Sequence, residues 1–344
     1  MQLDERKKRI LLAIIQDYIA TAEPVGSRTI AKKYELGVSP ATIRNEMADL
    51  EEMGYIEQPH TSAGRIPSDL GYRYYVDFLM EKYRLADEDR EYIRQGFETR
   101  RMEVAQVIQR TGQLLSQMTN YTTIVLGPQL GKTGIKHVQL VPVEPGKALL
   151  VMVSLSGLVQ NRLIEIPENL SAEDLWQISQ VLNAKLHGKT IADIRRTLLQ
   201  EIYSELARQR AVAELVLDLL SQEELLSGEE KVYLAGILNI LNQPEFRNIE
   251  KIKTLLSLLE QEEQLRHLVQ PEDEGLLVRI GAENPIQVMR DCSMITATYT
   301  VDGQVVGAIG VLGPTRMEYA RVMALVEYIT ENLSQMLTDF YRRT

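Results

Sequence analysis

The sequence contains few cysteines and histidines, the residues that build disulfides and many metal sites, and it has no long apolar run. Its 344 residues include one cysteine, one tryptophan and four histidines. The single Cys292 cannot form an internal disulfide, and the scattered histidines lack metal-ligand spacing. No apolar run reaches the roughly 18 residues that a bilayer span needs, and the N-terminus is charged where a signal peptide would be apolar. We therefore predict a cytoplasmic protein without disulfide, metal or membrane association.

Positive charge is also scarce. Lysine and arginine total 38 against 48 acidic residues, which gives a net charge of −10. A chain of this charge is not expected to coat nucleic acid or an anionic membrane non-specifically. Any contact with nucleic acid must therefore come from a few basic and polar groups in a local arrangement. The hydrophobic content of 44% is typical of a globular protein, and the length favours two or three domains.

Apolar periodicity near the N-terminus predicts two short helices in succession. The first lies within Leu3–Ala20 and ends before Pro24. Ser27 can cap a second helix, which continues to about Tyr34. A glycine follows at position 37, where it supplies a permissive turn.

A third helix has a clear start signal, because Ser39 can cap it and Pro40 suits its first position. Its apolar stripe, with spacings of four and three, consists of Ile43, Met47 and Leu50. The polar side chains near its N-terminal end are Thr42, Arg44 and Asn45. Acidic residues on its later turns are Asp49, Glu51 and Glu52. This charge gradient favours a helix that presents its N-terminal end to a DNA groove.

Two short extended segments follow, on either side of a turn at Thr61–Gly64. Pro59 and Pro67 limit them to a few residues each, which suits an edge ribbon. Arg65 lies at the exit of the turn. Three helices followed by a two-stranded ribbon indicate a winged helix-turn-helix that binds DNA. The alternative is a small helical bundle whose hairpin binds protein.

The candidate contacts divide into those that read bases and those that position the domain. Arginine and asparagine suit bidentate contact with guanine or adenine, so Arg44 and Asn45, with Thr42, are expected at base edges or adjacent phosphates. Residues at the second helix and the ribbon are expected to contact the backbone or minor groove. His60 and Thr61 also fit ordinary turn chemistry. The full set is Ser27, Arg28, Ser39, Thr42, Arg44, Asn45, His60, Thr61 and Arg65.

The remainder of the chain predicts an α+β domain with an insertion. Helices are expected at Leu70–Tyr83 and Gly96–Asn120, and then four β-rich runs in an antiparallel meander. Those runs are "YTTIVLG", "KHVQLVPV", "ALLVMVS" and "LVQNRLIEI". A mostly helical stretch follows, with one possible strand in "KVYLAGIL", before the sheet resumes in "GLLVRIG", "CSMITATYTV" and "VVGAIGVLG". A last helix is expected from about Arg316 to Tyr341. A sheet that is interrupted and resumed favours one α+β domain with an insertion.

Two glycine-rich segments resemble nucleotide-binding motifs but fail on spacing. Gly127–Gly134, "GPQLGKTG", has three residues where the phosphate loop needs four, and a strand follows instead of a helix. Gly307–Met317 has the spacing G-x-x-G-x-x-G, which is not the dinucleotide fingerprint. No paired carboxylates or catalytic triad pattern is present. We therefore expect no catalytic residues and no cofactor, and predict that the protein is not an enzyme.

Four segments resemble the HrcA-type heat-inducible transcription repressors of bacteria. They are "VSPATIRNEMADLEEMGYIEQPHTSAGRIPSDLGYRYYVD" (Val38–Asp77), "LNQPEF" (Leu241–Phe246), "VRIGAEN" (Val278–Asn284) and "GAIGVLGPTRMEYARV" (Gly307–Val322). The resemblance implies repression of chaperone operons through an inverted-repeat DNA operator called CIRCE. It also implies that the GroE chaperonin promotes the DNA-binding form. Unfolded protein would then relieve repression by occupying the chaperonin.

The resemblance further implies a domain organisation. A winged helix-turn-helix with its exit helix would occupy residues 1–83. A GAF-like α+β domain would occupy 84–167 and 274–344, and a mostly helical dimerisation domain would be inserted at 168–273. A homodimer also follows from the DNA-binding unit itself, since one recognition helix covers only a half-site. The alternative function is a small-molecule-responsive winged-helix regulator with a ligand pocket in the GAF-like domain.

Overall fold

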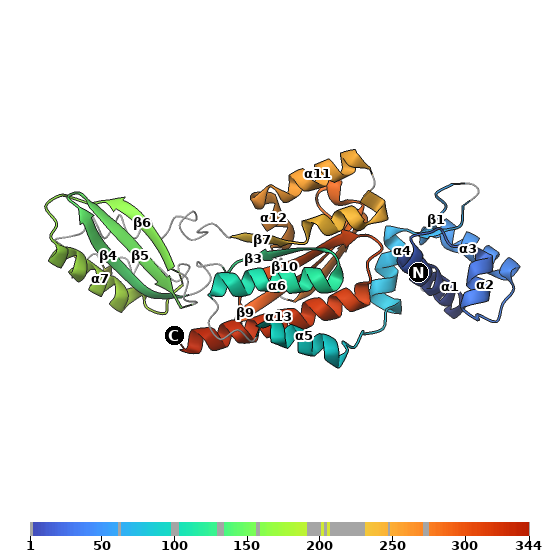
Figure 1. Cartoon of the computed structure of the whole chain (residues 1–344), viewed down its shortest axis with the longest axis horizontal. Coiled ribbons are helices and arrows are strands. Elements are labelled where there is room, and N and C mark those ends of the chain that lie inside the picture. The colour runs from blue at the N-terminus through green and yellow to red at the C-terminus, as the bar shows by residue number, and fades with distance from the viewer. Residues whose placement is uncertain are drawn as a thin grey trace. The chain divides into compact units, whose positions relative to one another are not determined.

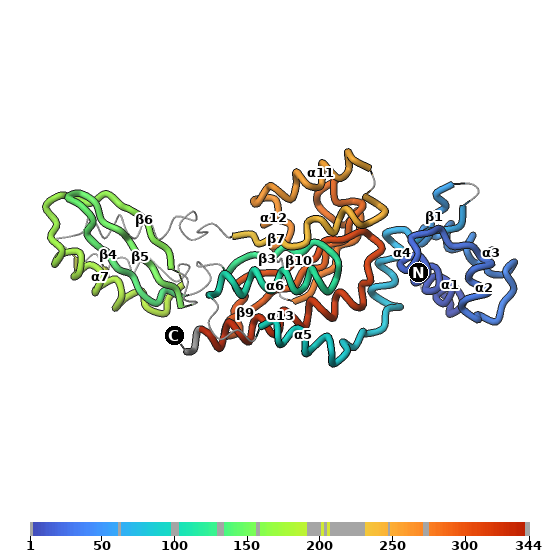
Figure 2. The backbone as a smooth tube through the Cα atoms, viewed as in Figure 1, coloured from blue at the N-terminus to red at the C-terminus, as the bar shows by residue number. Residues whose placement is uncertain are grey.

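The computed structural model describes residues 3–60, 63–97, 103–128, 134–155, 159–190, 201–202, 205–206, 231–246, 248–270 and 275–343. Packing divides the chain into two compact units, each of them built from several segments (Figure 2). The first consists of Met1–Val125, Tyr233–Ala297 and Ile309–Thr330. The second consists of Leu126–Val232, Thr298–Ala308 and Glu331–Thr344. No helix in the described ranges is both long and apolar enough to cross a membrane.

The chain begins with three helices, α1 (Glu5–Thr21), α2 (Ser27–Lys33) and α3 (Pro40–Glu52) (Figure 1). The predicted start of α3 is confirmed, because the Ser39 side chain accepts a hydrogen bond from the backbone N–H of Thr42. The predicted apolar stripe of α3 is fully or almost fully buried. The predicted cap of α2 is wrong. Gly26 holds the capping position without a side-chain hydrogen bond, and Ser27 is the first helical residue.

A small antiparallel ribbon follows, made of β1 (Ile56–Glu57) and β2 (Ile66–Pro67). Its base is tied to the segment before α2, because the backbones of Val25 and Arg65 exchange two hydrogen bonds of 2.8 and 2.9 Å. Ser68 then caps the short helix α4 (Asp69–Tyr74). One π-helical turn, η1 (Tyr75–Leu79), continues it. The helix predicted over Leu70–Tyr83 is therefore shorter than expected. We call residues 3–79 the N-terminal domain.

Helices α5 (Asp87–Phe97) and α6 (Val104–Thr119) lead into a five-stranded sheet with the order β7-β3-β10-β9-β8. Its strands are β3 (Thr122–Leu126), β7 (Val232–Ala235), β8 (Leu276–Ile280), β9 (Cys292–Val301) and β10 (Gln304–Pro314). The β10–β3 and β8–β9 pairs are antiparallel. Every residue of β3 is buried, and β10 is buried from Val306 to Pro314, which is typical of a sheet covered on both faces.

The remaining elements of the sheet region surround those strands. They are the 3-10 turns η4 (Ile237–Asn242), η5 (Pro244–Phe246), η6 (Gly281–Glu283) and η7 (Gln287–Met289), and the helices α11 (Ile249–Leu259), α12 (Glu262–Val269) and α13 (Tyr319–Arg343). The predicted resumption of the sheet after the helical stretch, and the predicted last helix, are confirmed. We call the five-stranded sheet with these elements and α6 the sheet domain.

The predicted four-stranded meander is wrong in one strand. β4 (Ile135–Glu144), β5 (Lys147–Ser154) and β6 (Val159–Glu165) form an antiparallel three-stranded sheet of their own. The run "YTTIVLG" is β3 instead, which pairs with β10 far along the chain. Alternating burial along β5 marks one covered and one open sheet face.

Helix α7 (Ala172–Leu186) covers one face of the three-stranded sheet (Figure 1). Its buried leucines and isoleucine share a core with the inward residues of the strands. Asn183 fixes the helix to β4, because its side chain bonds both the N–H and the C=O of Val138 at 2.7 and 2.8 Å. This core draws residues from both of the ranges 84–167 and 168–273. We call β4 to β6 with α7 the inserted subdomain.

Candidate nucleic-acid interface

The N-terminal end of α3 carries four of the candidate residues. Ser39 is exposed, and its hydroxyl lies 3.0 Å from that of Thr42. Arg44 and Asn45 are both exposed on the first turns of the helix. Neither makes a hydrogen bond or ion pair within the described parts of the chain. Two donor-rich side chains are therefore available to a ligand beside a capped helix end, where the helix dipole favours negative charge.

The acidic residues of α3 are mostly neutralised inside the N-terminal domain. Lys7 of α1 lies between two of them, with its Nζ 2.7 Å from Glu46 and 3.0 Å from Asp49. Arg6 adds a second contact to Glu46 at 3.3 Å. The hydrogen bonds to Glu46 and Asp49 raise the pKa of Lys7, so its charge persists at every physiological pH. These acids therefore contribute less negative field at the exposed helix end than their number indicates.

Arg65 is not free at the ribbon as the sequence suggests. Its Nε and Nη2 lie 2.8 and 2.7 Å from the Glu51 carboxylate on the late part of α3. The side chain is only 21% exposed. Contact of Arg65 with phosphate would compete with this ion pair. No local sequence signal indicates the pair, because its members are 14 residues apart.

The other candidates lie on separate elements. Ser27 is half-buried and Arg28 is exposed, both on the first turn of α2. His60 is exposed at the turn of the ribbon. Thr61 lies outside the described residues. The structure thus groups Ser39, Thr42, Arg44 and Asn45 on one helix end and places the other described candidates on α2 and the ribbon.

Sequence reasoning missed a buried carboxylate in this domain. Asp17 of α1 is 5% exposed and pairs with the Nζ of Lys33 at 2.5 Å, and Tyr34 lies within 3.5 Å of the same oxygen. The pair fixes the C-terminal end of α2 against α1. Lys33 is half-exposed, and its position follows from this bond rather than from a role at the surface. Separation by 16 residues again leaves no local signal.

The described residues offer no alternative site of metal or thiol chemistry. No group of three or more histidine, cysteine, aspartate or glutamate side chains in those ranges could hold a metal ion. Cys292 is fully buried at the start of β9. Burial raises the pKa of its thiol to about 12, so the thiol stays protonated at neutral pH.

A polar helix end on a three-helix domain with a ribbon, joined to a larger α+β body, defines a DNA-binding regulator of transcription. Residues 105–323 match the family "HrcA protein C terminal domain". The heat-inducible transcription repressor HrcA of Pelotomaculum thermopropionicum is 57% identical, and the match covers 100% of this chain and 99% of that protein. The heat-inducible transcription repressor HrcA of Desulforudis audaxviator is 55% identical, and the match covers 99% of this chain and 100% of that protein.

A crystal structure described as that of a hypothetical protein has the same architecture. It is 27% identical, it covers 98% of this chain and 99% of its own, and its TM-score is 0.63. The likeness supports the fold, while the identities above establish the relationship. The chain belongs to the HrcA family of heat-inducible transcription repressors.

The Arg65–Glu51 pair leads to a first prediction. Replacing Glu51 by glutamine frees the guanidinium of Arg65 for phosphate, so we expect DNA affinity at low salt to rise by up to about tenfold. On a single half-site the slope of log affinity against log salt should steepen by about 0.9, as one added phosphate contact predicts. Fluorescence anisotropy across a salt series measures both.

The matched control is Glu52→Gln, which makes the same charge change at an exposed neighbour on α3. It should raise affinity less and leave the salt slope unchanged. Equal slopes for the two variants would contradict a phosphate contact by Arg65.

Proposed function

We propose that this repressor acts in the cytoplasm on chaperone operons, and that it binds an inverted-repeat operator of the CIRCE type as a homodimer. Heat stress releases it. The observation that carries the proposal is the exposed pair Arg44 and Asn45 at the capped end of α3, a helix on which three of the four acids are paired internally. In this reading the N-terminal domain is a winged helix-turn-helix with α3 as its recognition helix.

Two kinds of DNA contact are proposed. Arg44 and Asn45 reach base edges in the major groove, where a guanidinium pairs with guanine and an amide with adenine. Thr42 and Ser39 approach the adjacent phosphates through hydroxyls that are already ordered by the helix cap. Contacts from Ser27, Arg28 and His60 go to the backbone and set the register of the domain, together with Thr61 and with Arg65 when Glu51 releases it.

The open face of the inserted subdomain is the proposed dimer interface. Val141, Leu149 and Leu163 pair in register across the three strands on the face opposite α7. Of these, Val141 is 41% and Leu163 is 53% exposed. A second row of cross-strand neighbours on the same face ends at Val159, which is 60% exposed. Aliphatic side chains aligned on an open sheet are typical of a face that a second copy buries, and an inverted repeat requires a two-fold protein.

The domain assignment follows from these cores. We infer that the insertion comprises about residues 127–231, because β4 to β6 share their hydrophobic core with α7 and not with the five-stranded sheet. The sheet domain is then the GAF-like part, formed by β3 with β7 to β10 and the helices α6 and α11 to α13. Dimerisation by the insertion leaves the N-terminal domain of each copy free to take one half-site.

Arg44 provides the second prediction. Arg44→Ala should weaken binding to the inverted repeat by about 10- to 100-fold, since one bidentate base contact per half-site is lost. Binding to an unrelated duplex should change far less. An electrophoretic shift on both duplexes measures the two affinities. Arg94→Ala is the matched control, because it removes an exposed arginine from α5, outside the N-terminal domain. Equal losses on both duplexes would contradict base recognition by Arg44.

A third prediction concerns the dimer. Leu163→Asp places a charge in the middle of the open sheet face and should raise the dimer dissociation constant by about 100-fold or more. Gln180→Asp makes a similar change on the exposed side of α7 and should leave the dimer intact. Analytical ultracentrifugation gives the oligomeric state. A Leu163→Asp protein that sediments as a tight dimer would exclude this face as the interface.

The chaperonin gives a fourth prediction. Purified GroE added to the purified repressor should increase the fraction that binds the inverted repeat, and an excess of unfolded protein should cancel the increase by occupying the chaperonin. The competing function, a small-molecule sensor, predicts that protein-free cell extract alters the affinity instead. Titration of operator binding under the two additions separates them. An effect of extract alone would favour the sensor.

A further inference from the structure

Two arginine clusters attach the N-terminal domain to the sheet domain. The first centres on Arg316, in the turn between β10 and α13, whose side chain is 14% exposed. It pairs through Nε with Glu245 and donates through Nη2 to the side-chain oxygen of Gln243 at 3.2 Å. Its Nη1 donates to the backbone oxygen of Ile19 in α1, also at 3.2 Å. One guanidinium thus joins η5 and its preceding residue to the first helix of the N-terminal domain.

The second cluster lies on α4 and the η6 turn. Arg73 pairs with Glu283, with Nε 2.8 Å from the carboxylate, and donates to the backbone oxygen of Val278 at 2.6 Å. Asp69 accepts a hydrogen bond of 2.8 Å from the backbone N–H of Ala282. The hydrogen bond that Arg73 donates to Glu283 raises the pKa of Arg73, which is the sign of a strongly paired guanidinium.

The close approach of η6 to α4 explains why position 281 is a glycine. Gly281 has a φ of 53°, and a Cβ at this position would lie 2.1 Å from the Asp69 carboxylate oxygens. A side chain would therefore be strained by its backbone and would displace Asp69.

Tyrosine rings fill the space between the two clusters. Tyr72 and Tyr75 contact Tyr319 of α13, with ring centroids 5.8 and 6.5 Å apart. Tyr319 is fully buried, and its hydroxyl lies 2.6 Å from both the Ser293 hydroxyl and the Thr315 backbone oxygen. We call the two arginine clusters and these three rings the joint.

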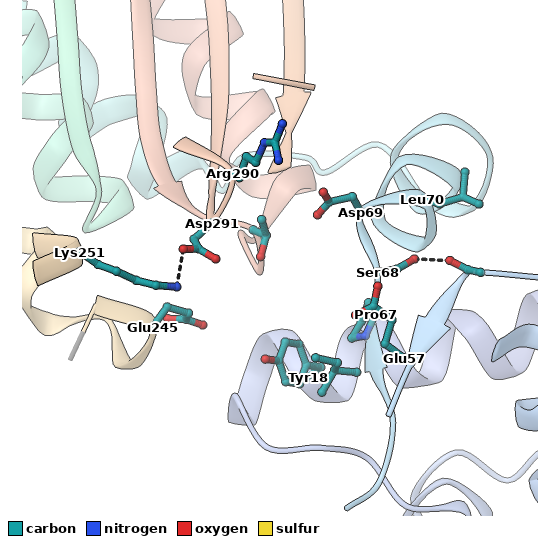
Figure 3. A pocket seen from close by; sticks show the side chains of 13 residues that line it. Tyr18, Glu57, Pro67, Ser68, Asp69, Leu70, Glu245, Lys251, Arg290 and Asp291 are labelled. Atoms are coloured by element: carbon teal, nitrogen blue, oxygen red, sulfur yellow. Dashed lines mark hydrogen bonds and ion pairs between the residues drawn. The ribbon is translucent and has the colours of Figure 1, made fainter. Parts of the chain in front are cut away.

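The joint is narrow because a cavity of about 650 Å³ lies beside it (Figure 3). Tyr18 and Glu57 of the N-terminal domain line it on one side, and Lys251 and Asp291, which pair at 2.5 Å, line it on the other. The lining of this cavity is mostly polar and charged, so the packing at the joint comes from the three tyrosine rings. The polar groups are also incompletely matched, since Tyr72 Oη and one oxygen of Glu245 are buried without a hydrogen-bond partner.

We propose that Arg316 and Arg73 are positioning residues that fix the orientation of the N-terminal domain, and through it the half-site spacing that the repressor accepts. The proposal rests on the proposed dimeric binding to an inverted repeat. In a two-fold dimer the separation of the two recognition helices depends on how each N-terminal domain is held by the rest of its chain. The tyrosine rings give the joint its buried contact, and the directional bonds of the two arginines fix its orientation, so their loss lets each domain reach half-sites at other distances.

The test measures operator affinity as the spacer of the inverted repeat is varied. We expect the wild-type protein to prefer the natural spacer over one lengthened by about five base pairs, half a helical turn, by about 100-fold. Arg316→Ala and Arg73→Ala should each reduce that preference by about tenfold. Their affinity for an isolated half-site should stay at the wild-type value, because the recognition helix is untouched.

Arg321→Ala is the matched control. It removes a guanidinium five residues along the chain that pairs with Glu318 of its own segment at 3.7 Å, and it should keep the wild-type preference. Arg316→Lys retains the charge but cannot bridge three acceptors, and it should restore only part of the preference. Circular dichroism and sedimentation show that each variant is a folded dimer, and Arg73→Ala tests the same inference should Arg316→Ala fail to fold.

The outcomes separate this inference from the function on which it rests. A wild-type protein that fails to bind the inverted repeat contradicts the proposed function. A wild-type protein that binds with a clear spacer preference, while both arginine variants keep the same preference, overturns the inference alone. A wild-type protein that binds all spacers equally overturns it as well.

Discussion

The ion pairs between Lys7 and the acids of α3 are the interaction on which the charge distribution of the N-terminal domain depends. A net charge of −10 opposes association with a polyanion, and α3 itself carries four acids. Lys7 holds Glu46 and Asp49 in short contacts, and Arg65 holds Glu51. Because the opposing charges are close, their fields cancel at the distance of a phosphate, while Arg44 keeps its charge unpaired at the other end of the helix. The Lys7 ion pairs also hold α1 against α3, so the contacts that neutralise these acids also stabilise the fold of the domain.

What the sequence predicts well is local. The capping of α3 by Ser39, the buried stripe at Ile43, Met47 and Leu50, and the last helix all follow from neighbours within a few positions, and the structure confirms each. The partner of β3 could not be predicted, because "YTTIVLG" has the composition of any buried strand and pairs with a strand more than 170 residues away. The cap of α2 failed for a related reason. Serine and glycine both suit that position, and adjacent residues compete for it.

The candidate site also combines features that local sequence predicts with features that depend on distant residues. Exposure of Arg44 and Asn45 could be predicted, since the apolar stripe of α3 fixes which face is buried. The state of Arg65 could not, because its partner Glu51 lies on another element and nothing in the spacing connects them. In the sequence, a basic residue at the exit of a turn looks available to phosphate whether or not it forms an ion pair with a carboxylate. The structure therefore shows Arg65 in an ion pair with Glu51, which the proposed contact with DNA would have to replace.

That exchange and the joint share a physical character. Both depend on a small number of charged hydrogen bonds, which at the joint act beside three packed tyrosine rings and a cavity. Directional bonds define one geometry sharply, but each contributes little net stability because water competes for the same groups. A repressor must hold its recognition helices in a defined place and also be removable from its operator. In the proposed complex, directional bonds added to limited aromatic packing would satisfy both needs, whereas an interface closed by broad apolar burial would satisfy only the first.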